Sequence, residues 1–210
     1  MIKPIHSSYL IPKHPVIYRE TIKKSRFIVH IGHTPDVESA KAFMAGIRSK
    51  YSDAGHHCWA HVAGEPGGSH VFGFSDDGEP NGTAGKPMLN VLMGSGVGEI
   101  TAVVTRYFGG IKLGTGGLVR AYGGSLNHAM EELNTIEKIH ETFIEGISDY
   151  SQQSIIKQEL SAYNILNIEK DYKENIAWKI TLDSREAAQI IAVIFDKTSG
   201  RVKFDWPEDL

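Results

Sequence analysis

The sequence predicts an α+β protein made of two domains, residues 1–138 and residues 139–210. Glycine usage changes at this boundary, because only Gly146 and Gly200 of the 22 glycines lie after residue 138. Charge changes there too: residues 1–138 carry 14 Lys and Arg against 12 Asp and Glu, whereas residues 139–210 carry 8 against 13. Both parts mix strand and helix periodicities, which indicates the α+β class.

The apolar pattern after residue 138 predicts six elements in the order strand, helix, strand, strand, helix, strand. Their expected ranges are 142–148, 152–163, 165–172, 176–182, 184–196 and 201–206. Ser184 is the expected N-cap of the second helix, because serine side chains accept hydrogen bonds from the first N–H groups of a helix. The βαββαβ order is that of the ferredoxin-like, split βαβ fold.

The first domain also mixes strands and helices. The expected strands are 25–33, 57–63, 70–74 and 100–108, and the expected helices are 37–51, 87–93 and 118–133. Pro87 suits the first position of its helix. Gly123 and Gly124 lie inside the last helix, where we expect them to permit close packing. Residues 135–141 are expected to form the connector between the domains.

Composition limits the classes of protein to which the chain can belong. The hydrophobic and charged fractions are 41% and 22%, as in an ordinary globular protein. No apolar run approaches the ~20 residues that cross a bilayer, and the N-terminus lacks the apolar core of a secretory signal. Cys58 is the only cysteine, so we expect a reducing, cytoplasmic setting with no membrane association. The small positive balance of residues 1–138 means that binding to a polyanion would use that part.

The most informative stretch is a glycine-rich bend, which reads RYFGGIKLGTGGLVRAY over residues 106–122. A helix start presents unpaired N–H groups and the positive end of its dipole. Arg106, Lys112 and Arg120 add positive charge, so the bend is a candidate site for phosphate or another anion. The alternative is that its glycines only shape a tight connection. They are Gly109, Gly110, Gly114, Gly116 and Gly117.

A second candidate is the acidic turn FSDDGEPNGTAGKP at residues 74–87. Asp76, Asp77 and Glu79 could hold a divalent metal or act as acid and base, with Lys86 on an anion at the following helix start. The alternative is a solvated turn in which Asp-Asp-Gly supplies turn chemistry. The residues favour neither interpretation over the other.

Other motifs give weaker signals. No Walker A, dinucleotide-binding, Gly-x-Ser-x-Gly or His-Glu-x-x-His pattern is present, so we expect no cofactor and no catalytic residue of those classes. On the expected strand 57–63, His57 and His61 share one face and Cys58 points to the other. A zinc site needs three or four converging ligands, so a satisfied or partly buried histidine pair is favoured.

Two further features concern RNA. Lys23, Lys24, Arg26 and Phe27 could form an RNA-facing edge, although an ordinary solvated strand entrance is favoured. Tyr107 or Phe108 could stack on a base, but their position in an apolar strand favours a role in the core.

Six motifs together resemble the IMPACT family, in its bacterial YigZ type. They are KKSRF (23–27), HHC (56–58), FSDDGEP (74–80), GTAGKP (82–87), GVGEI (96–100) and RYFGGIKLGTGGL (106–118). The resemblance implies an N-terminal domain like domain 2 of ribosomal protein S-five. It also implies a C-terminal domain similar to the last domain of elongation factor G. Eukaryotic relatives regulate translation during amino-acid starvation, and fold analogy alone carries that function to this chain.

We therefore expect a non-enzymatic protein that binds RNA or the translation machinery, possible partners being RNA, the ribosome, translation factors or another protein. The residues expected to bind the anion or nucleic acid are Lys86, Arg106, Gly109, Gly110, Lys112, Gly116, Gly117 and Arg120. The alternative is a metal-assisted enzyme acting on a small phosphorylated or anionic substrate through Asp76, Asp77 and Glu79. A third hypothesis is a purely protein-binding regulator.

Overall fold

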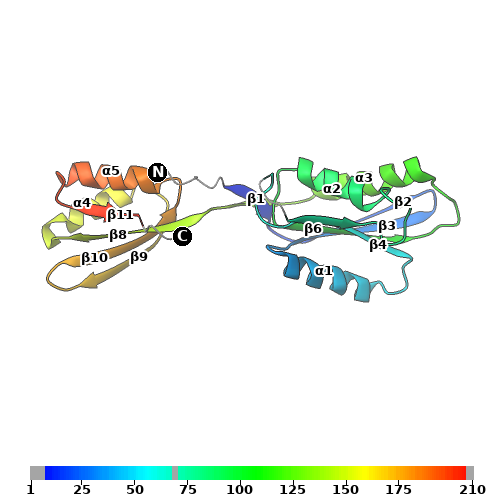
Figure 1. Cartoon of the computed structure of the whole chain (residues 1–210), viewed down its shortest axis with the longest axis horizontal. Helices are drawn as coiled ribbons and strands as arrows, with labels where there is room; N and C mark the ends of the chain where they lie inside the picture. The colour runs from blue at the N-terminus through cyan, green and yellow to red at the C-terminus, as the bar shows by residue number, and fades with distance from the viewer. Residues whose placement is uncertain (1–7, 68–70, 207–210) are drawn as a thin grey trace. The chain divides into compact units, whose positions relative to one another are not determined.

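A computed structural model describes residues 8–67 and 71–206 of the chain. These residues gather into two compact units (Figure 1): an N-terminal unit, Tyr9–Lys138, and a C-terminal unit that starts at Ile139. The described residues form sheets of two, four and five strands together with five α-helices. The predicted α+β class is therefore confirmed. None of the described helices combines the length and the apolar character needed to cross a bilayer.

A five-stranded antiparallel sheet forms the centre of the N-terminal unit, in the order β2-β3-β6-β4-β5. Its strands are β2 (Val16–Ile22), β3 (Ser25–His33), β4 (His56–Val62), β5 (Phe72–Ser75) and β6 (Ile100–Tyr107). β6 is central and buried along almost its whole length, as its apolar run predicts. The strand expected at residues 70–74 corresponds to β5, and His70 lies outside the described residues.

Helices cover both faces of this sheet (Figure 1). α2 (Gly85–Gly94) and α3 (Thr115–Glu131) pack on one face, and α1 (Val37–Lys50) lies on the other. The main core lies under α2 and α3, where Phe27, Met88 and Tyr122 are fully buried. α2 begins at Gly85, two residues before Pro87, because the Asp76 carboxylate accepts hydrogen bonds from the N–H groups of Ala84 and Gly85.

The segment expected to connect the domains contains a strand. β7 (Thr135–Lys138) pairs antiparallel with β1 (Tyr9–Pro12), in a two-stranded sheet whose partners lie more than a hundred residues apart. Each strand has only four residues, and Pro12 offers no N–H group to the ladder. Local periodicity cannot reveal so short a long-range pairing.

A buried carboxylate holds this two-stranded sheet against the larger one. The Glu99 side chain is 3% exposed and accepts hydrogen bonds from Tyr9 of β1 (2.9 Å), from His33 of β3 (2.6 Å) and from Lys138 of β7. The Glu99 backbone has a positive φ of 51°, which is uncommon for a residue with a side chain. One residue therefore joins the ends of three strands.

The C-terminal unit follows the predicted order of strand, helix, strand, strand, helix, strand. Its elements are β8 (Glu141–Ser148), η1 (Tyr150–Gln152), α4 (Gln153–Leu160), β9 (Ile165–Tyr172), β10 (Ile176–Asp183), α5 (Ala187–Lys197) and β11 (Lys203–Asp205). The four strands form one antiparallel sheet in the order β11-β8-β10-β9. α4 and α5 cover one of its faces (Figure 1), where Trp178 is buried and donates from Nε1 to Ser148 Oγ at 2.8 Å.

Two local expectations are wrong. Ser184 does not cap α5, which begins at Ala187; its hydroxyl is buried without a hydrogen-bond partner among the described residues, and Asp183 orders the preceding turn by accepting from the Arg185 N–H at 2.9 Å. Gly124 does not permit close packing either, since a Cβ there would meet nothing within 4 Å. A Cβ at Gly123 would make only an ordinary contact with Pro87, at 3.8 Å.

The glycine environments predict opposite effects of alanine at two positions. Gly124→Ala should raise the free energy of unfolding by up to ~1 kcal/mol, because alanine has a higher helix propensity and space is available. Gly85→Ala should lower it, because the new Cβ would lie 2.6–2.8 Å from backbone atoms of Ser75. Chemical denaturation of the two variants measures both effects. Equal changes in the two variants would contradict this account.

The Glu99 cluster predicts a specific acid sensitivity. Burial raises the pKa of Glu99, but the hydrogen bonds from Lys138, His33 and Tyr9 outweigh burial and lower it from its usual 4.5. A carboxyl group with a depressed folded-state pKa stabilises the fold above its unfolded pKa and loses that effect as the pH falls through the folded value. Stability should therefore fall below about pH 4.5, and less steeply in Glu99→Gln.

Urea denaturation between about pH 3 and pH 7 measures this dependence. Glu131→Gln is the matched control, because Glu131 is exposed at the end of α3, and it should keep the wild-type slope. A Glu99→Gln variant with the same slope as the wild type would show that Glu99 is not responsible.

Candidate functional site

The glycine bend between β6 and α3 packs against the turn that joins β2 to β3. A Cβ at Gly109 would lie 2.0 Å from the carbonyl carbon and oxygen of Lys24, so only glycine fits at this contact. The Gly109 N–H also donates to Ser25 Oγ at 3.2 Å. Two motifs that lie over eighty residues apart in the sequence therefore form one surface.

The β2–β3 turn is unusual because two lysines occupy its tip. Lys23 and Lys24 have positive φ values of 46° and 68°, a conformation that two-residue hairpin turns normally assign to asparagine or glycine. Both side chains are exposed. Arg26 follows at the start of β3, and its guanidinium lies 4.2 Å from the centre of the Tyr107 ring. The turn thus presents three cations beside the bend.

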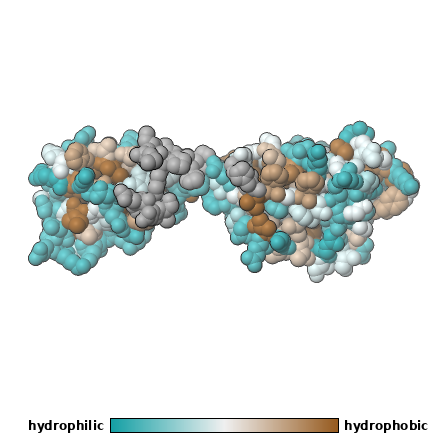
Figure 2. Space-filling model, in the orientation of Figure 1, coloured by the Kyte–Doolittle hydropathy of each residue, from teal (hydrophilic) through white to brown (hydrophobic). Residues whose placement is uncertain are grey.

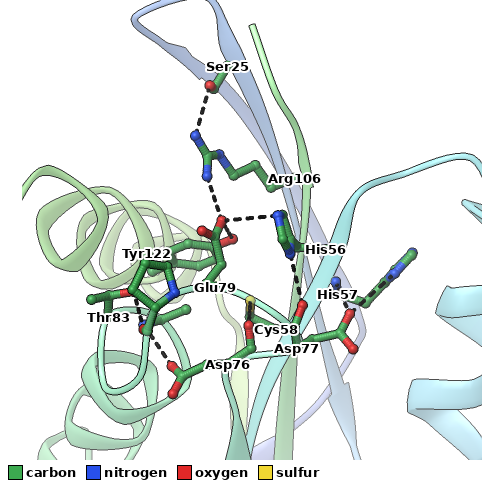
Figure 3. Close-up of polar contacts among 12 residues, drawn as sticks. Ser25, His56, His57, Cys58, Asp76, Asp77, Glu79, Thr83, Arg106 and Tyr122 are labelled. Atoms are coloured by element: carbon green, nitrogen blue, oxygen red, sulfur yellow. Dashed lines mark hydrogen bonds and ion pairs between the residues drawn. The ribbon is translucent and has the colours of Figure 1, made fainter. Parts of the chain in front are cut away.

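Arg106 does not present its charge at the surface. Its side chain is 6% exposed, and Nη1 donates to Glu79 Oε1 at 2.5 Å (Figure 3). Nη2 donates to Ser25 Oγ at 3.3 Å, and Nε has no partner among the described residues. Arg106, which the sequence predicted to bind phosphate, therefore lies beneath the bend and forms a buried ion pair.

Glu79 accepts from a second buried group. The Tyr122 hydroxyl of α3 donates to Glu79 Oε1 at 2.8 Å, and burial raises the pKa of that hydroxyl strongly. His56 lies on the solvent side of the same carboxylate, with Nε2 3.9 Å from Oε1 (Figure 3). Because a carbonyl oxygen only accepts, the 2.8 Å contact from His56 Nδ1 to the Asp77 carbonyl places a hydrogen on Nδ1.

The carboxylate of Asp76 caps α2. Oδ1 accepts from the N–H groups of Ala84 (2.9 Å) and Gly85 (2.8 Å), and Oδ2 accepts from that of Gly82 (2.8 Å). A negative side chain in this position satisfies the unpaired donors of the helix and complements its dipole. The second glycine-preceded helix start therefore holds an anion of its own.

Asp77 faces the opposite side of the turn, toward α1. It accepts from Arg48 Nη2 and from the His57 N–H, each at 2.6 Å. Burial raises the pKa of Asp77, but these two hydrogen bonds outweigh it and lower the pKa. Its φ of 39° is positive, as the tight Asp-Asp-Gly turn requires.

The three carboxylates of the acidic turn thus bind different groups: Asp76 the start of α2, Asp77 the Arg48 side chain, and Glu79 the Arg106 side chain. Within residues 8–67 and 71–206, no three His, Cys, Asp or Glu side chains are placed to hold a metal ion. The possible metal or acid–base role of Asp76, Asp77 and Glu79 remains a prediction, and the contacts of these residues assign them to the architecture of the turn.

The remaining predicted cations are available at the surface. Lys86, Lys112 and Arg120 are exposed, and Arg120 Nη1 would lie 3.8 Å from a Cβ at Gly116, over the first turn of α3. α3 begins at Thr115, and no described side chain caps it, so the N–H groups of its first turn, which contains Gly116 and Gly117, lack a side-chain acceptor there. Gly110 has a φ of 85° that favours glycine.

Phe108 also differs from the sequence expectation. It is not a core residue, because 58% of its surface is exposed although it directly follows the buried strand β6. The strand ends at Tyr107, and the chain turns outward at that point. Tyr107 is partly buried and donates from its hydroxyl to Asp53 Oδ1 at 2.7 Å.

The residues of β4 lie as the alternation of the strand predicts. Cys58 is buried in the core under α2 and α3, and burial raises its pKa to about 12, so it is no ready nucleophile. His57 points to the opposite face of the sheet, where its Nε2 donates to the Tyr51 carbonyl at 3.0 Å. His61 stacks on Trp59 with 5.6 Å between ring centres, and burial lowers its pKa.

Comparison with known proteins identifies the family. The model of the Impact N-terminal domain matches residues 23–130, which include the glycine bend and the acidic turn. The chain belongs to the IMPACT family. The sequence-based recognition of this family is confirmed.

Relatives in the family match along nearly the whole chain. The chain is 50% identical to the IMPACT family member YigZ of Escherichia coli, over 93% of this chain and 96% of that protein. It is 36% identical to the IMPACT family member YvyE of Bacillus subtilis, over 92% and 88%. A crystal structure described as that of a hypothetical protein shares 48% identity and aligns with a TM-score of 0.68, covering 97% of this chain and 98% of the other.

Sequence reasoning missed several residues of the buried cluster. Ser25, His56 and Tyr122 were present in the family motifs or on the core face of α3, but no local pattern marks them as partners of Glu79. The available signal was the absence of a second charge to balance Arg106 within its own strand. Its partner lies 27 residues earlier, in the acidic turn.

The buried ion pair predicts a large stability difference between two variants. Glu79→Gln should lower the free energy of unfolding by roughly 3–5 kcal/mol, because it leaves the Arg106 charge buried without a counterion. Arg48→Ala removes the partner of Asp77 at the surface and should cost about 1 kcal/mol or less. Chemical denaturation compares them, and a Glu79→Gln cost as small as that of Arg48→Ala would contradict the role of the pair.

Proposed function

We propose that this protein binds RNA through one end of its N-terminal unit, as part of translation control and without catalysing a reaction. The observation that carries the proposal is the contact between Gly109 and the Lys24 backbone, which joins the β2–β3 turn to the glycine bend. This contact collects exposed cations from three segments of the chain. We call them the cationic end: Lys23, Lys24, Arg26, Lys112 and Arg120.

The described carboxylates do not neutralise the charges of the cationic end. Among residues 8–67 and 71–206, no carboxylate forms an ion pair with any of the five side chains. Arg106 and Glu79 neutralise each other beneath the surface. Unpaired cations beside the first turn of a helix are the groups that bind phosphates, and release of counterions makes such binding favourable and sensitive to salt.

The open face of the C-terminal sheet carries a different distribution of charge from the cationic end, which supports placing the RNA site at the cationic end. Neighbouring residues on that face include Asp205 opposite Glu145, and Lys179 opposite Glu169. Asp171 lies opposite Ala177 on the next row. Lys203 lies opposite Ile147 on that row, Lys179 pairs with Glu145, and Lys173 pairs with Asp171. Cations and carboxylates are therefore nearly balanced on this face, unlike at the cationic end. On the face that Figure 2 shows, hydrophobic residues form small patches among hydrophilic ones.

In this proposal Arg106 holds the bend in place and does not contact phosphate. Its ion pair fixes the floor of the bend, while Lys112, Arg120 and the N–H groups of Gly116 and Gly117 face the ligand. Gly110 provides the positive φ that turns the chain. Lys86 lies at the start of α2 and extends the exposed charge of the same unit.

The proposal includes the domain comparisons and the cellular setting. The strand order β11-β8-β10-β9 supports a ferredoxin-like C-terminal domain, residues 139–210, similar to the last domain of elongation factor G. We propose that residues 1–138 form a domain like domain 2 of ribosomal protein S-five, and that the protein acts in the cytoplasm. The metal-assisted enzyme has less support, since Asp76, Asp77 and Glu79 already serve other partners.

RNA binding should be strongly dependent on salt and on the cationic end. Removing two phosphate contacts with Lys112→Ala and Arg120→Ala should weaken binding at low salt and reduce the slope of log affinity against log salt by about 2. Fluorescence anisotropy with a labelled RNA measures both quantities. The matched control is Lys157→Ala with Lys197→Ala, which removes two exposed helix cations from the C-terminal unit. Equal losses in the two double variants would overturn the placement of the site.

A further inference from the structure

Phe108 is an exposed aromatic ring that lies beside a buried guanidinium. The Arg106 guanidinium lies over it, with 5.7 Å from Cζ to the ring centre, and lies 5.6 Å from the centre of the Phe27 ring. Both distances are within the range of cation–π attraction. Arg106 is thus placed between a buried aromatic ring and an exposed one.

The guanidinium that supports the ring cannot easily move. Glu79 and Ser25 hold two of its nitrogens, and more than half of the Phe108 surface remains in solvent. The ring is therefore supported on the Arg106 side and accessible on its exposed side. A fixed aromatic surface costs a ligand little ordering entropy when it binds.

Two exposed lysines lie near Phe108, in the bend and in the adjoining turn. Lys112 follows in the same bend, and the backbone of Lys24 lies against Gly109, the residue next to Phe108. Proteins that bind single-stranded nucleic acids combine such elements, with cations along the backbone and aromatic rings under the bases.

We propose that Phe108 is a stacking platform for one unpaired base, and that this ring beside the cationic end makes the site select single-stranded over double-stranded RNA. This inference rests on the proposed RNA-binding function and specifies the substrate class of the same site. A paired base inside a duplex has both of its faces covered by neighbours, so it cannot stack on Phe108 until it is extruded. The cations alone would bind either form of RNA.

The test measures fluorescence anisotropy with three labelled RNA probes of about 12 nucleotides, which is within the usual site size. They are a single strand of mixed sequence, the same strand in a duplex, and a strand without bases. The wild type should bind the single strand most tightly. Phe108→Ala should weaken that binding about tenfold and leave the affinities for the duplex and the base-free strand unchanged.

Two further variants make the test specific. Ile111→Ala removes another exposed apolar side chain of the same bend and should change none of the affinities. Phe108→Trp should retain single-strand binding, and its indole fluorescence should be quenched by the single strand but not by the base-free strand. Thermal unfolding should show that all three variants fold, because both positions are exposed.

Particular results would overturn the inference. Equal wild-type affinity for the single strand and the base-free strand, or an equal effect of Phe108→Ala and Ile111→Ala, would show that no base stacks on the ring, while RNA binding itself would stand. No binding to any probe at low salt would overturn the proposed function together with the inference.

Discussion

The buried ion pair between Arg106 and Glu79 is the interaction on which the candidate site depends. Neither side chain is more than 6% exposed, and a buried charge without its partner is strongly destabilising. Ser25 extends the cluster to the β2–β3 turn, and Tyr122 extends it to α3. Because four segments meet at this pair, the glycine bend has a fixed floor. The exposed cations above this floor are therefore free to bind a ligand, because the buried pair, and not these cations, holds the bend in shape.

The strongly periodic elements could be predicted from the sequence, since β6 buries one continuous apolar run and α3 buries an apolar stripe. α1 was also predicted, although Ala40 is its one fully buried residue. The exposure of Lys112 and Arg120 also agrees with their position in a polar bend. The directions of Arg106 and Phe108 could not be predicted, because they depend on where β6 ends and on Glu79, a partner distant in sequence. The pairing of β1 with β7 was missed for a similar reason, as two four-residue strands carry little local signal.

Arg106 is buried and Phe108 is exposed, the reverse of the sequence expectation. This difference changes how the bend would recognise a ligand. A bend with an exposed arginine would hold phosphate by a charge-assisted fork. The observed bend buries that charge and places an aromatic ring at the surface instead. Positive charge comes from its neighbours, including two lysines in strained backbone conformations. Such a conformation persists where surrounding contacts enforce it, and the pairing of Ile22 with Ser25 across the two-residue turn does so here.

Amide hydrogen exchange, measured with and without a single-stranded RNA, tests the central claim most directly. The account predicts slower exchange in residues 22–26 and 108–120, which carry the cationic end and the first turn of α3, and unchanged exchange in β8, β9, β10 and β11. Protection confined to the C-terminal sheet, or exchange at the bend unaffected by saturating RNA, would contradict it.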